Sequence, residues 1–407
     1  MIKRPRGTKD LYDEEMEIFE YIEKAAKETF EKANVGRLQT PVFEFTELFS
    51  RGVGDDTDIV QKEMYTFIDK GDRSLTLRPE GTAGAVRAYL ENGMSSLPSP
   101  KKLWYLIPIY RYENVQKGRQ REFNQIGLEY FGSDRPEADF EVIYLAFEIL
   151  KKLGISNDTI LKINSIGCPV CREKYKEKLK EVLKEKISSY CDDCKRRYDT
   201  NILRVLDCKD KHDKKENEEL PSILDYLCDD CKKHFENLKK LLESSNVKFE
   251  IDDKIVRGLD YYTRTVFEIL DKDGLAILGG GRYDGLSEVL GGEKVPAVGF
   301  AIGVERVMGI IKDKDIDFKD KSKKFFVITE DFPKAYEITS KLREKGIIVE
   351  QDLLGRSIRA SLKKASKLEF DFSIFVNEGN YVLKNMEDGS EEEFLDKDKL
   401  IDKILNI

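Results

Sequence analysis

The first part of the chain opens with hydrophobic residues at helical spacing and continues with alternating patterns. Between Tyr12 and Ala33 the apolar residues recur every three or four positions, which predicts an amphipathic helix. The segments that follow read as strands, with one further helix over 137–153. The predicted strands cover residues 36–48, 73–77, 103–112, 125–131 and 160–166, with a polar loop at 113–124. Residues 1–166 are therefore predicted to form an α+β region.

The pattern changes at residue 167. Residues 167–248 contain all seven cysteines, many lysines and glutamates, and apolar residues at helical spacing. This combination predicts a separate small helical module. Strand and turn patterns return over residues 249–318, and the charged segment 312–324 reads as a linker.

The last part of the chain alternates between strand and helix patterns. Strands are predicted over 325–329, 347–351 and 372–376, with helices over 333–345 and 356–368 between them. Alternation of this kind is typical of a small α/β domain. We place this domain at residues 323–407.

Composition narrows the class of protein. The 407 residues are enough for two or three domains, and 40% hydrophobic with 36% charged residues is typical of a soluble globular protein. A net charge of −8 argues weakly against a nucleic-acid binder but allows a local basic surface. No apolar run approaches the ~18 residues that span a bilayer, and no apolar signal sequence opens the chain. We expect a cytoplasmic protein without membrane contact, whose cysteines stay reduced.

Glycine frames an arginine beside tyrosines in two separate segments. Arg257 lies in Val-Arg-Gly-Leu-Asp-Tyr-Tyr-Thr at 256–263, and Arg282 lies in Gly-Gly-Gly-Arg-Tyr-Asp-Gly-Leu at 279–286. A third segment of this kind begins at Arg111. A guanidinium is a planar, permanent charge that suits phosphate or carboxylate, and glycine lets backbone approach a ligand closely. These segments predict a pocket for a nucleotide phosphate and a small amphoteric molecule.

Each feature alone has a simpler explanation. An arginine in a glycine turn is more often a surface salt-bridge partner, and Tyr261 with Tyr262 fits ordinary strand packing. Glu80, after Pro79, fits the first turn of a helix, while Glu129 fits the solvent face of a strand. Because all of these segments occur in one chain, we favour a ligand-binding role over the simpler explanations.

Taken together and in their order, the motifs resemble the signatures of histidyl-tRNA synthetases, a family of class II (class IIa) aminoacyl-tRNA synthetases, across nearly the whole chain. The similar segments are the N-terminal signature at 6–10, motif 1 at 36–43, motif 2 at 111–123, motif 3 at 299–306, and the two histidine-specific motifs at 257–262 and 279–283. Motifs 2 and 3 indicate only the class. The histidine-specific motifs indicate the amino acid.

The resemblance implies an α+β architecture, domains that contact the tRNA, and a homodimer. The catalytic domain would be a class II antiparallel sheet with flanking helices, in two parts at 1–166 and 249–318. Residues 167–248 would form a helical insertion domain that clamps the acceptor arm of the tRNA. Residues 323–407 would form a C-terminal α/β anticodon-binding domain, and motif 1 implies a homodimer.

The resemblance also implies the activity, which is ligation of L-histidine to tRNA(His) through histidyl-adenylate. The implied ATP-binding residues are Arg111, Glu113, Arg119, Phe123 and Arg306. Arg111 and Arg257 are the implied catalytic residues, on opposite sides of the α-phosphate, and Phe123 stacks on adenine. Mg²⁺ is expected to accompany the pyrophosphate.

The amino-acid pocket must bind an ammonium, a carboxylate and an imidazole. The implied histidine-binding residues are Glu80, Thr82, Arg111, Gln125, Glu129, Arg257, Tyr261, Tyr262 and Tyr283. Among them, Glu80 and Thr82 face the ammonium, and Gln125 contacts the carboxylate side. Glu129 and Tyr262 satisfy the two ring nitrogens. Such a pocket rejects analogues that lack these polar atoms, because its own buried groups would be left unpaired.

Expected RNA contacts lie in two places. Lys117, Arg119 and Arg121 in the motif 2 loop are the candidates for the acceptor end of the tRNA. In the C-terminal domain, the basic helix at 355–364 offers cations to phosphates. Ser361 replaces the glutamine of the typical family pattern, so individual anticodon contacts are not assigned.

Three pairs of cysteines have the Cys-X-X-Cys spacing of metal knuckles. They are Cys168 with Cys171, Cys191 with Cys194, and Cys228 with Cys231, and Cys208 follows the second pair with His212 nearby. Two such pairs would match a four-thiolate zinc site, which would help a small module with little core. Reduced cysteines on helices are the alternative. Spacing alone does not select ligands, so structural zinc stays an open question and no metal ligand is assigned.

Two other functions compete with the synthetase. A regulatory subunit of ATP phosphoribosyltransferase, a histidine-sensing paralogue, would keep the amino-acid pocket but lose the motif 2 cations and the C-terminal domain. A stand-alone RNA-binding or zinc module would have a degenerate catalytic part. Arg111, Arg119 and Arg306 are all present, and a domain follows residue 324, so the synthetase is favoured.

Overall fold

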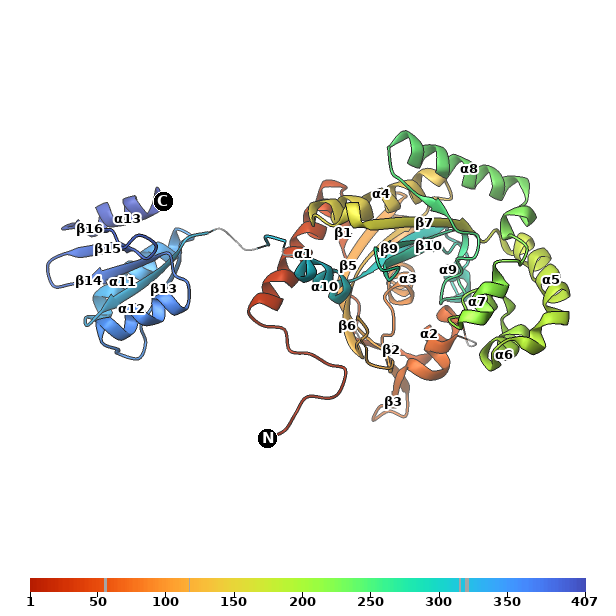
Figure 1. The fold of residues 1–407 in the computed structure, drawn as a ribbon, viewed down its shortest axis with the longest axis horizontal. Helices are drawn as coiled ribbons and strands as arrows, with labels where there is room; N and C mark the ends of the chain where they lie inside the picture. Colours follow the sequence, from red (N-terminus) through yellow and green to blue (C-terminus); the bar gives the residue numbers. More distant parts are fainter. Residues whose placement is uncertain (55–56, 117, 315, 319–321) are drawn as a thin grey trace. The chain divides into compact units, whose positions relative to one another are not determined.

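The computed structural model describes residues 1–54, 57–116, 118–314, 316–318 and 322–407 (Figure 1). The chain forms two compact units, Met1–Phe318 and Lys319–Ile407, which we describe separately. In the described parts, no helix is long and apolar enough to cross a membrane.

The first unit is built on a sheet that contains eight strands in the described residues. The spatial order of the strands is β1 (Gly36–Arg37), β5 (Lys101–Tyr110), β6 (Glu122–Phe131), β11 (Ala297–Gly303), β10 (Ala276–Arg282), β9 (Thr263–Asp271), β7 (Thr159–Ser165) and β8 (Glu250–Ile251). The pairs β1–β5 and β7–β8 are parallel, and the pairs between them are antiparallel. The predicted antiparallel α+β fold is therefore confirmed.

Helices cover both faces of this sheet. One face packs against α1 (Glu14–Lys32), α4 (Pro136–Lys152), α8 (Asp229–Ser244) and α10 (Val304–Asp313), whose apolar sides form the largest core of the unit. The other face packs against α3 (Thr82–Glu91) and the short α9 (Leu286–Val289). Next to them lie α2 (Thr46–Val53) and a three-stranded sheet of β2 (Phe43–Phe45), β4 (Ser74–Leu77) and β3 (Tyr65–Ile68).

The structure differs from the sequence prediction at two places near the site. The strand predicted to reach residue 48 ends earlier, because α2 starts at Thr46 and buries Phe49 and Val53 one helical turn apart. The polar loop predicted over 113–124 is shorter, because the hairpin partner of Tyr110 is Glu122 and β6 begins there.

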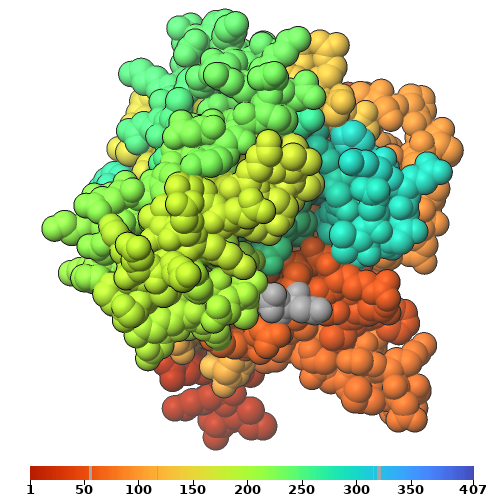
Figure 2. Space-filling view, turned by 90° about the vertical axis from the view of Figure 1, so that its right-hand side faces the viewer, coloured from red at the N-terminus to blue at the C-terminus, as the bar shows by residue number. Residues whose placement is uncertain are grey.

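Residues 167–248 form helices with a small core of their own inside the first unit. The helices are α5 (Pro169–Lys186), α6 (Asp192–Thr200), α7 (Lys211–Asn217) and α8, and the core includes Tyr175, Leu179 and Leu183. Helix α8 also returns to the catalytic sheet, where His234 Nε2 lies 2.7 Å from Asp139 Oδ2 on α4. Figure 2 shows the yellow-green and green atoms of this insertion beside the orange and teal atoms of the catalytic part.

The second unit is a five-stranded sheet with helices. Its strand order is β13 (Ile348–Gln351), β12 (Lys324–Thr329), β14 (Phe372–Val376), β15 (Tyr381–Asn385) and β16 (Glu391–Phe394). The helices are α11 (Phe332–Glu344), α12 (Ile358–Lys367) and α13 (Lys397–Leu405). The predicted alternation over 325–376 is confirmed to within a few residues, whereas β15, β16 and α13 were not predicted.

Candidate active site

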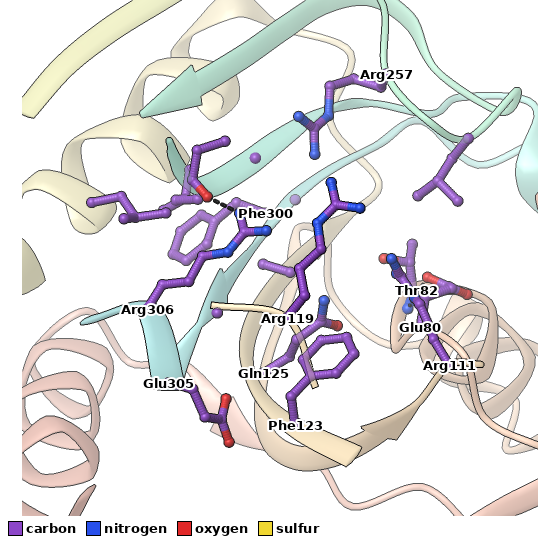
Figure 3. A pocket seen from close by; sticks show the side chains of 18 of the residues that line it. Glu80, Thr82, Arg111, Arg119, Phe123, Gln125, Arg257, Phe300, Glu305 and Arg306 are labelled. Atoms are coloured by element: carbon purple, nitrogen blue, oxygen red, sulfur yellow. Dashed lines mark hydrogen bonds between the residues drawn. The ribbon is translucent and has the colours of Figure 1, made fainter. Parts of the chain in front are cut away.

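A cavity of about 270 Å³ opens over strands β6, β11 and β10 of the first unit (Figure 3). Its walls come from the start of α3, the loop between β5 and β6, the segment before β9, strand β10, and the end of β11. The predicted site residues in these walls are Glu80, Thr82, Arg111, Glu113, Arg119, Phe123, Gln125, Arg257, Tyr261, Tyr262, Tyr283 and Arg306. Residues 226 positions apart in the sequence, Glu80 and Arg306, thus share one cavity.

Four arginines from three separate segments face this cavity. Figure 3 shows Arg119, Arg257 and Arg306 reaching toward the same space, with Arg111 at its other side. Burial, together with the charges of Arg119, Arg111 and Arg257, lowers the pKa of Arg306. A nearby like charge disfavours the ionised form of a group, so this effect is consistent with the convergence of these arginines on one space. The result is a fixed positive potential suited to a polyphosphate.

Backbone contacts fix the orientation of these arginines. Arg111 Nε donates to the carbonyl of Pro79 at 2.7 Å, and its guanidinium lies 5.6 Å from the centre of the Phe123 ring. Arg306 Nε donates to the carbonyl of Gly118 at 3.2 Å. Arg119 lies 3.4 Å from the carboxylate of Glu113, which also lies 3.7 Å from Arg111. The cationic wall is therefore preorganised.

Arg257 is held by Glu268 of β9 in a close salt bridge. Burial opposes the charge on Arg257, but the Glu268 carboxylate outweighs this and raises the pKa of the guanidinium. Gly279 makes room for it, because a Cβ at that position would overlap the guanidinium. The Nε of Arg257 is buried and has no hydrogen-bond partner within the described protein.

Glu129 is the centre of a hydroxyl network beneath the cavity. Its carboxylate accepts hydrogen bonds from Thr82 Oγ1 at 2.8 Å, from the Tyr105 hydroxyl at 2.9 Å, and from the Tyr283 hydroxyl. Burial raises the pKa of Glu129 to about 8. Gly299 opposite leaves the necessary space, since a Cβ there would overlap the carboxylate. Glu129 itself lies behind Thr82 and Tyr283 rather than in the cavity wall.

Glu80 and Gln125 occupy the same end of the cavity. The carboxylate of Glu80 accepts from the backbone N–H groups of Thr82 and Ala83, each at 2.7 Å, and so caps α3. Burial raises the pKa of Glu80. Gln125 Oε1 is buried without a partner among the described residues, as expected for a group that awaits a polar ligand.

The tyrosines of the histidine-specific segments form one cluster. The ring centres of Tyr261 and Tyr262 are 4.7 Å apart, and those of Tyr261 and Tyr283 are 5.6 Å apart. Two arginines of the insertion hold the backbone of this segment. Arg172 Nη1 donates to the carbonyl of Tyr262, and Arg204 Nη1 donates to the carbonyl of Arg257, both at 3.0 Å.

The expectation that Arg282 would offer its fork to a ligand is wrong. Its side chain is fully buried and paired with Asp139, while it also donates to Asp284 Oδ1 at 3.0 Å and to the carbonyl of Ser133 at 2.7 Å. Asp139 further accepts from Thr265 Oγ1 at 2.6 Å. This buried network joins α4 to the sheet and has a structural role.

The loop cations stand in different places. Arg121 is outside the cavity wall, with its guanidinium 3.9 Å from the centre of the Tyr112 ring and its backbone N–H bonded to the carbonyl of Gly7 at 2.8 Å. Lys117 lies outside the described residues.

Sequence reasoning missed several residues of this site. Tyr105 and Glu268 sit on strands where alternation hides their role. Glu305 lines the cavity and accepts from the backbone N–H and side chain of Asn124, at 2.9 Å each for its Oε1. It immediately precedes Arg306 in the motif 3 segment, and that position was the available signal.

Cysteines in the insertion form groups that could hold a metal. One group contains Cys168, Cys171, Cys228 and Cys231, and another contains Cys191, Cys194, Cys208 and Asp213. Neither lies in the wall of the cavity.

Comparisons with known proteins agree with this geometry. The family model described as "Histidyl-tRNA synthetase" matches residues 7–307. The histidine–tRNA ligases of Acetivibrio thermocellus and Thermoanaerobacter sp. strain X514 are 48% and 47% identical, over 99% and 100% of both chains. Apo histidyl-tRNA synthetase of S. aureus superposes with a TM-score of 0.82 at 34% identity, covering 99% of this chain and 100% of that one. The chain therefore belongs to the histidyl-tRNA synthetase family.

Proposed function

We propose that this chain is a histidine–tRNA ligase that works in the cytoplasm. It activates L-histidine with ATP to give histidyl-adenylate and pyrophosphate, and then transfers histidine to the 3′ end of tRNA(His). The observation that carries the proposal is the meeting of four arginines in one cavity, above a tyrosine–glutamate network, in a chain of this family.

The arginines act on the first step. The histidine carboxylate attacks the α-phosphorus, and negative charge grows on the phosphate oxygens before the pyrophosphate leaves. Fixed cations stabilise that charge most when they need no reorganisation. Arg111 and Arg257 flank the α-phosphate as catalytic residues, while Arg119 and Arg306 hold the rest of the nucleotide. Glu113 and Phe123 hold the adenine, and Phe123 does so by stacking.

The other end of the cavity selects histidine. Glu80 and Thr82 face the ammonium, and Gln125 faces the carboxylate side with an Oε1 that has no protein partner among the described residues. Tyr262 binds one imidazole nitrogen. Glu129 acts on the other nitrogen from behind Thr82 and Tyr283, because its carboxylate accepts hydrogen bonds from the hydroxyls of these two residues. Tyr261 and Tyr283 pack the ring. An amino acid without the ring nitrogens would leave these groups unpaired.

Carboxylates that would hold Mg²⁺ are present in the cavity wall. Besides Glu80, the described residues in the cavity wall include two acidic ones, Glu113 and Glu305. Mg²⁺ commonly uses one or two carboxylates together with phosphate oxygens and water. When bound, the ion neutralises charge on the departing pyrophosphate. The residues themselves orient the nucleotide and hold Asn124 and Arg119 in place.

The tRNA contacts and the dimer are also part of the proposal. Arg119 and Arg121 of the motif 2 loop meet the acceptor end, and residues 323–407 bind the anticodon arm. Val42 and Phe43 of the motif 1 segment are more than one-third exposed, and so are Phe45, Phe67 and Ile68 of the small sheet to which Phe43 belongs. Exposed apolar patches of this kind mark association sites, so we place the homodimer interface here.

Histidine-dependent exchange between pyrophosphate and ATP tests the first step with the purified full chain. We expect exchange with L-histidine and none with L-phenylalanine, which has an aromatic ring but no ring nitrogens. Charging of tRNA(His) tests the second step. Folded protein that binds histidine but shows no exchange would overturn the proposal and would favour a histidine-sensing regulatory subunit.

A further inference from the structure

All seven cysteines of the chain fall into two groups within the insertion. Cys168, Cys171, Cys228 and Cys231 form cluster A, and Cys191, Cys194 and Cys208 form cluster B together with Asp213. Within each cluster the four possible ligand atoms lie within 4.8 Å of one another. We propose that each cluster binds one Zn²⁺ ion, so that the chain carries two structural zinc ions outside its active site.

The spacing of the sulfur atoms fits mononuclear tetrahedral sites. Cys168 Sγ lies 3.5 Å from Cys171 Sγ, and Cys191 Sγ lies 3.7 Å from Cys208 Sγ. A disulfide would bring the sulfurs to about 2 Å. Zinc–sulfur bonds of about 2.3 Å place tetrahedral ligands roughly 3.8 Å apart. An iron–sulfur cluster would need room between the thiolates for its own irons and sulfides, which this spacing does not leave.

Cluster A is built from two matching knuckles. Cys168 precedes α5 and Cys228 precedes α8, so each pair straddles the first turn of a helix. Helix N-termini favour thiolates. The backbone N–H of Cys228 donates to Cys171 Sγ at 3.1 Å. Gly167, with φ +67°, turns the chain between the strand β7 and the first knuckle. These features hold four thiols together where the insertion begins and where α8 starts back toward the eight-stranded sheet.

Cluster B includes a buried carboxylate. Asp213 is 1% exposed and accepts from the backbone N–H of Cys191 at 3.0 Å, while Cys208 Sγ lies 3.3 Å from its Oδ2. Asp213 therefore presents a buried carboxylate to the three thiols of the cluster. Three thiolates and one carboxylate are a donor set that zinc accepts.

The two clusters adjoin the arginines that hold the histidine-specific segment. Arg172 directly follows Cys171 and bonds the carbonyl of Tyr262. Arg204 precedes Cys208 by four residues and bonds the carbonyl of Arg257. Metal binding therefore fixes the two supports of the cavity wall, in a module whose own core is small.

Metal analysis of the full chain, purified in reducing buffer without chelators after growth with zinc, tests the proposal. We expect two zinc ions per chain. Cys231→Ser removes one zinc, Cys194→Ser removes one, and the double variant removes both. Asp213→Asn weakens the second site, whereas Asp199→Asn is the matched control, because Asp199 is exposed on α6 and belongs to neither cluster.

X-ray absorption at the zinc edge is measured on the wild-type chain, so this second test does not depend on whether the variants fold. Seven sulfur ligands to one oxygen ligand, shared by two ions, is the expected average. Less than half an equivalent of zinc, or iron in its place, overturns the proposal. If the chain holds one zinc ion with four sulfur ligands, the proposal is wrong for cluster B. Loss of metal in Asp199→Asn but not in Cys194→Ser would overturn the ligand set of cluster B.

Discussion

The hydroxyl of Tyr283 donates a hydrogen bond to the carboxylate of Glu129, although the two residues are 154 positions apart. Tyr283 belongs to the second histidine-specific segment, and Glu129 to the strand that carries motif 2. The bond therefore ties the two parts of the catalytic domain together under the amino-acid end of the cavity. It also gives a buried carboxylate three hydroxyl donors in place of water.

The first prediction concerns pH and Glu129. Its pKa rises from an ordinary 4.5 to about 8 in the folded chain, with burial as the main cause. The folded state then holds a proton that the unfolded state releases between these two values, so stability should fall as pH rises through this window. The loss is up to about 1.4 kcal/mol per pH unit where only this group titrates. Glu129→Gln stays neutral at all these pH values, so its free energy of unfolding, measured by denaturant unfolding at each pH, should fall less steeply with pH. If the free energies of the variant and the wild type fall in parallel with pH, the assignment to Glu129 is wrong.

The second prediction concerns Arg257. Arg257→Ala should lower the rate of histidine-dependent ATP–pyrophosphate exchange by about 10²–10³-fold, because it removes a fixed charge that acts in the transition state. Histidine affinity, measured by calorimetry, should change far less. Arg135→Ala is the matched control, since that side chain is 73% exposed and far from the cavity wall. Activity near wild type in Arg257→Ala would remove this residue from the α-phosphate.

The third prediction concerns Gly279. An alanine there would push its Cβ into the guanidinium of Arg257, and a flexible side chain would move before the backbone does. Gly279→Ala should therefore lower exchange while the melting temperature stays within a few degrees of wild type. Gly285→Ala is the control, because nothing lies within 4 Å of the added Cβ. Equal exchange in both variants would show that the position of Arg257 is not critical.

The fourth prediction concerns the support from the insertion. Arg172→Met removes the bond to the carbonyl of Tyr262, and a lost hydrogen bond of about 1 kcal/mol corresponds to roughly a fivefold rise in KM for histidine. The KM for ATP and kcat should change little. Lys176→Met, on the same helix but in a surface pair with Glu173, should leave all three constants unchanged. A change in the ATP constant alone would point to a different role for this bond.

Motif order predicted which residues meet, because each motif carries a local signal that does not depend on distant packing. Arg257 and Arg282 nonetheless looked equivalent in the sequence. Their roles differ because Arg282 finds Asp139 in the core, whereas Arg257 lies over Gly279 at the cavity, and only the tertiary structure separates these cases. Glu129 is predicted to bind the imidazole ring, and its carboxylate lies behind Thr82 and Tyr283 rather than in the cavity wall.

The cysteine pairs show a similar limit. Spacing identified three knuckles but could not choose between them, because the pairing depends on how α5, α6 and α8 fold back on one another. The structure joins the first knuckle with the third, and it joins the second with Cys208 and Asp213. No spacing rule would have found the carboxylate.

Strand β11 is the last of the large sheet to be synthesised, yet it lies at the middle, between β6 and β10. A nascent chain on the ribosome that stops before residue 297 must therefore leave both of those strands with an open edge. Truncated products of this protein should be prone to aggregate, because the seam at the centre of the sheet closes only when its final strand arrives.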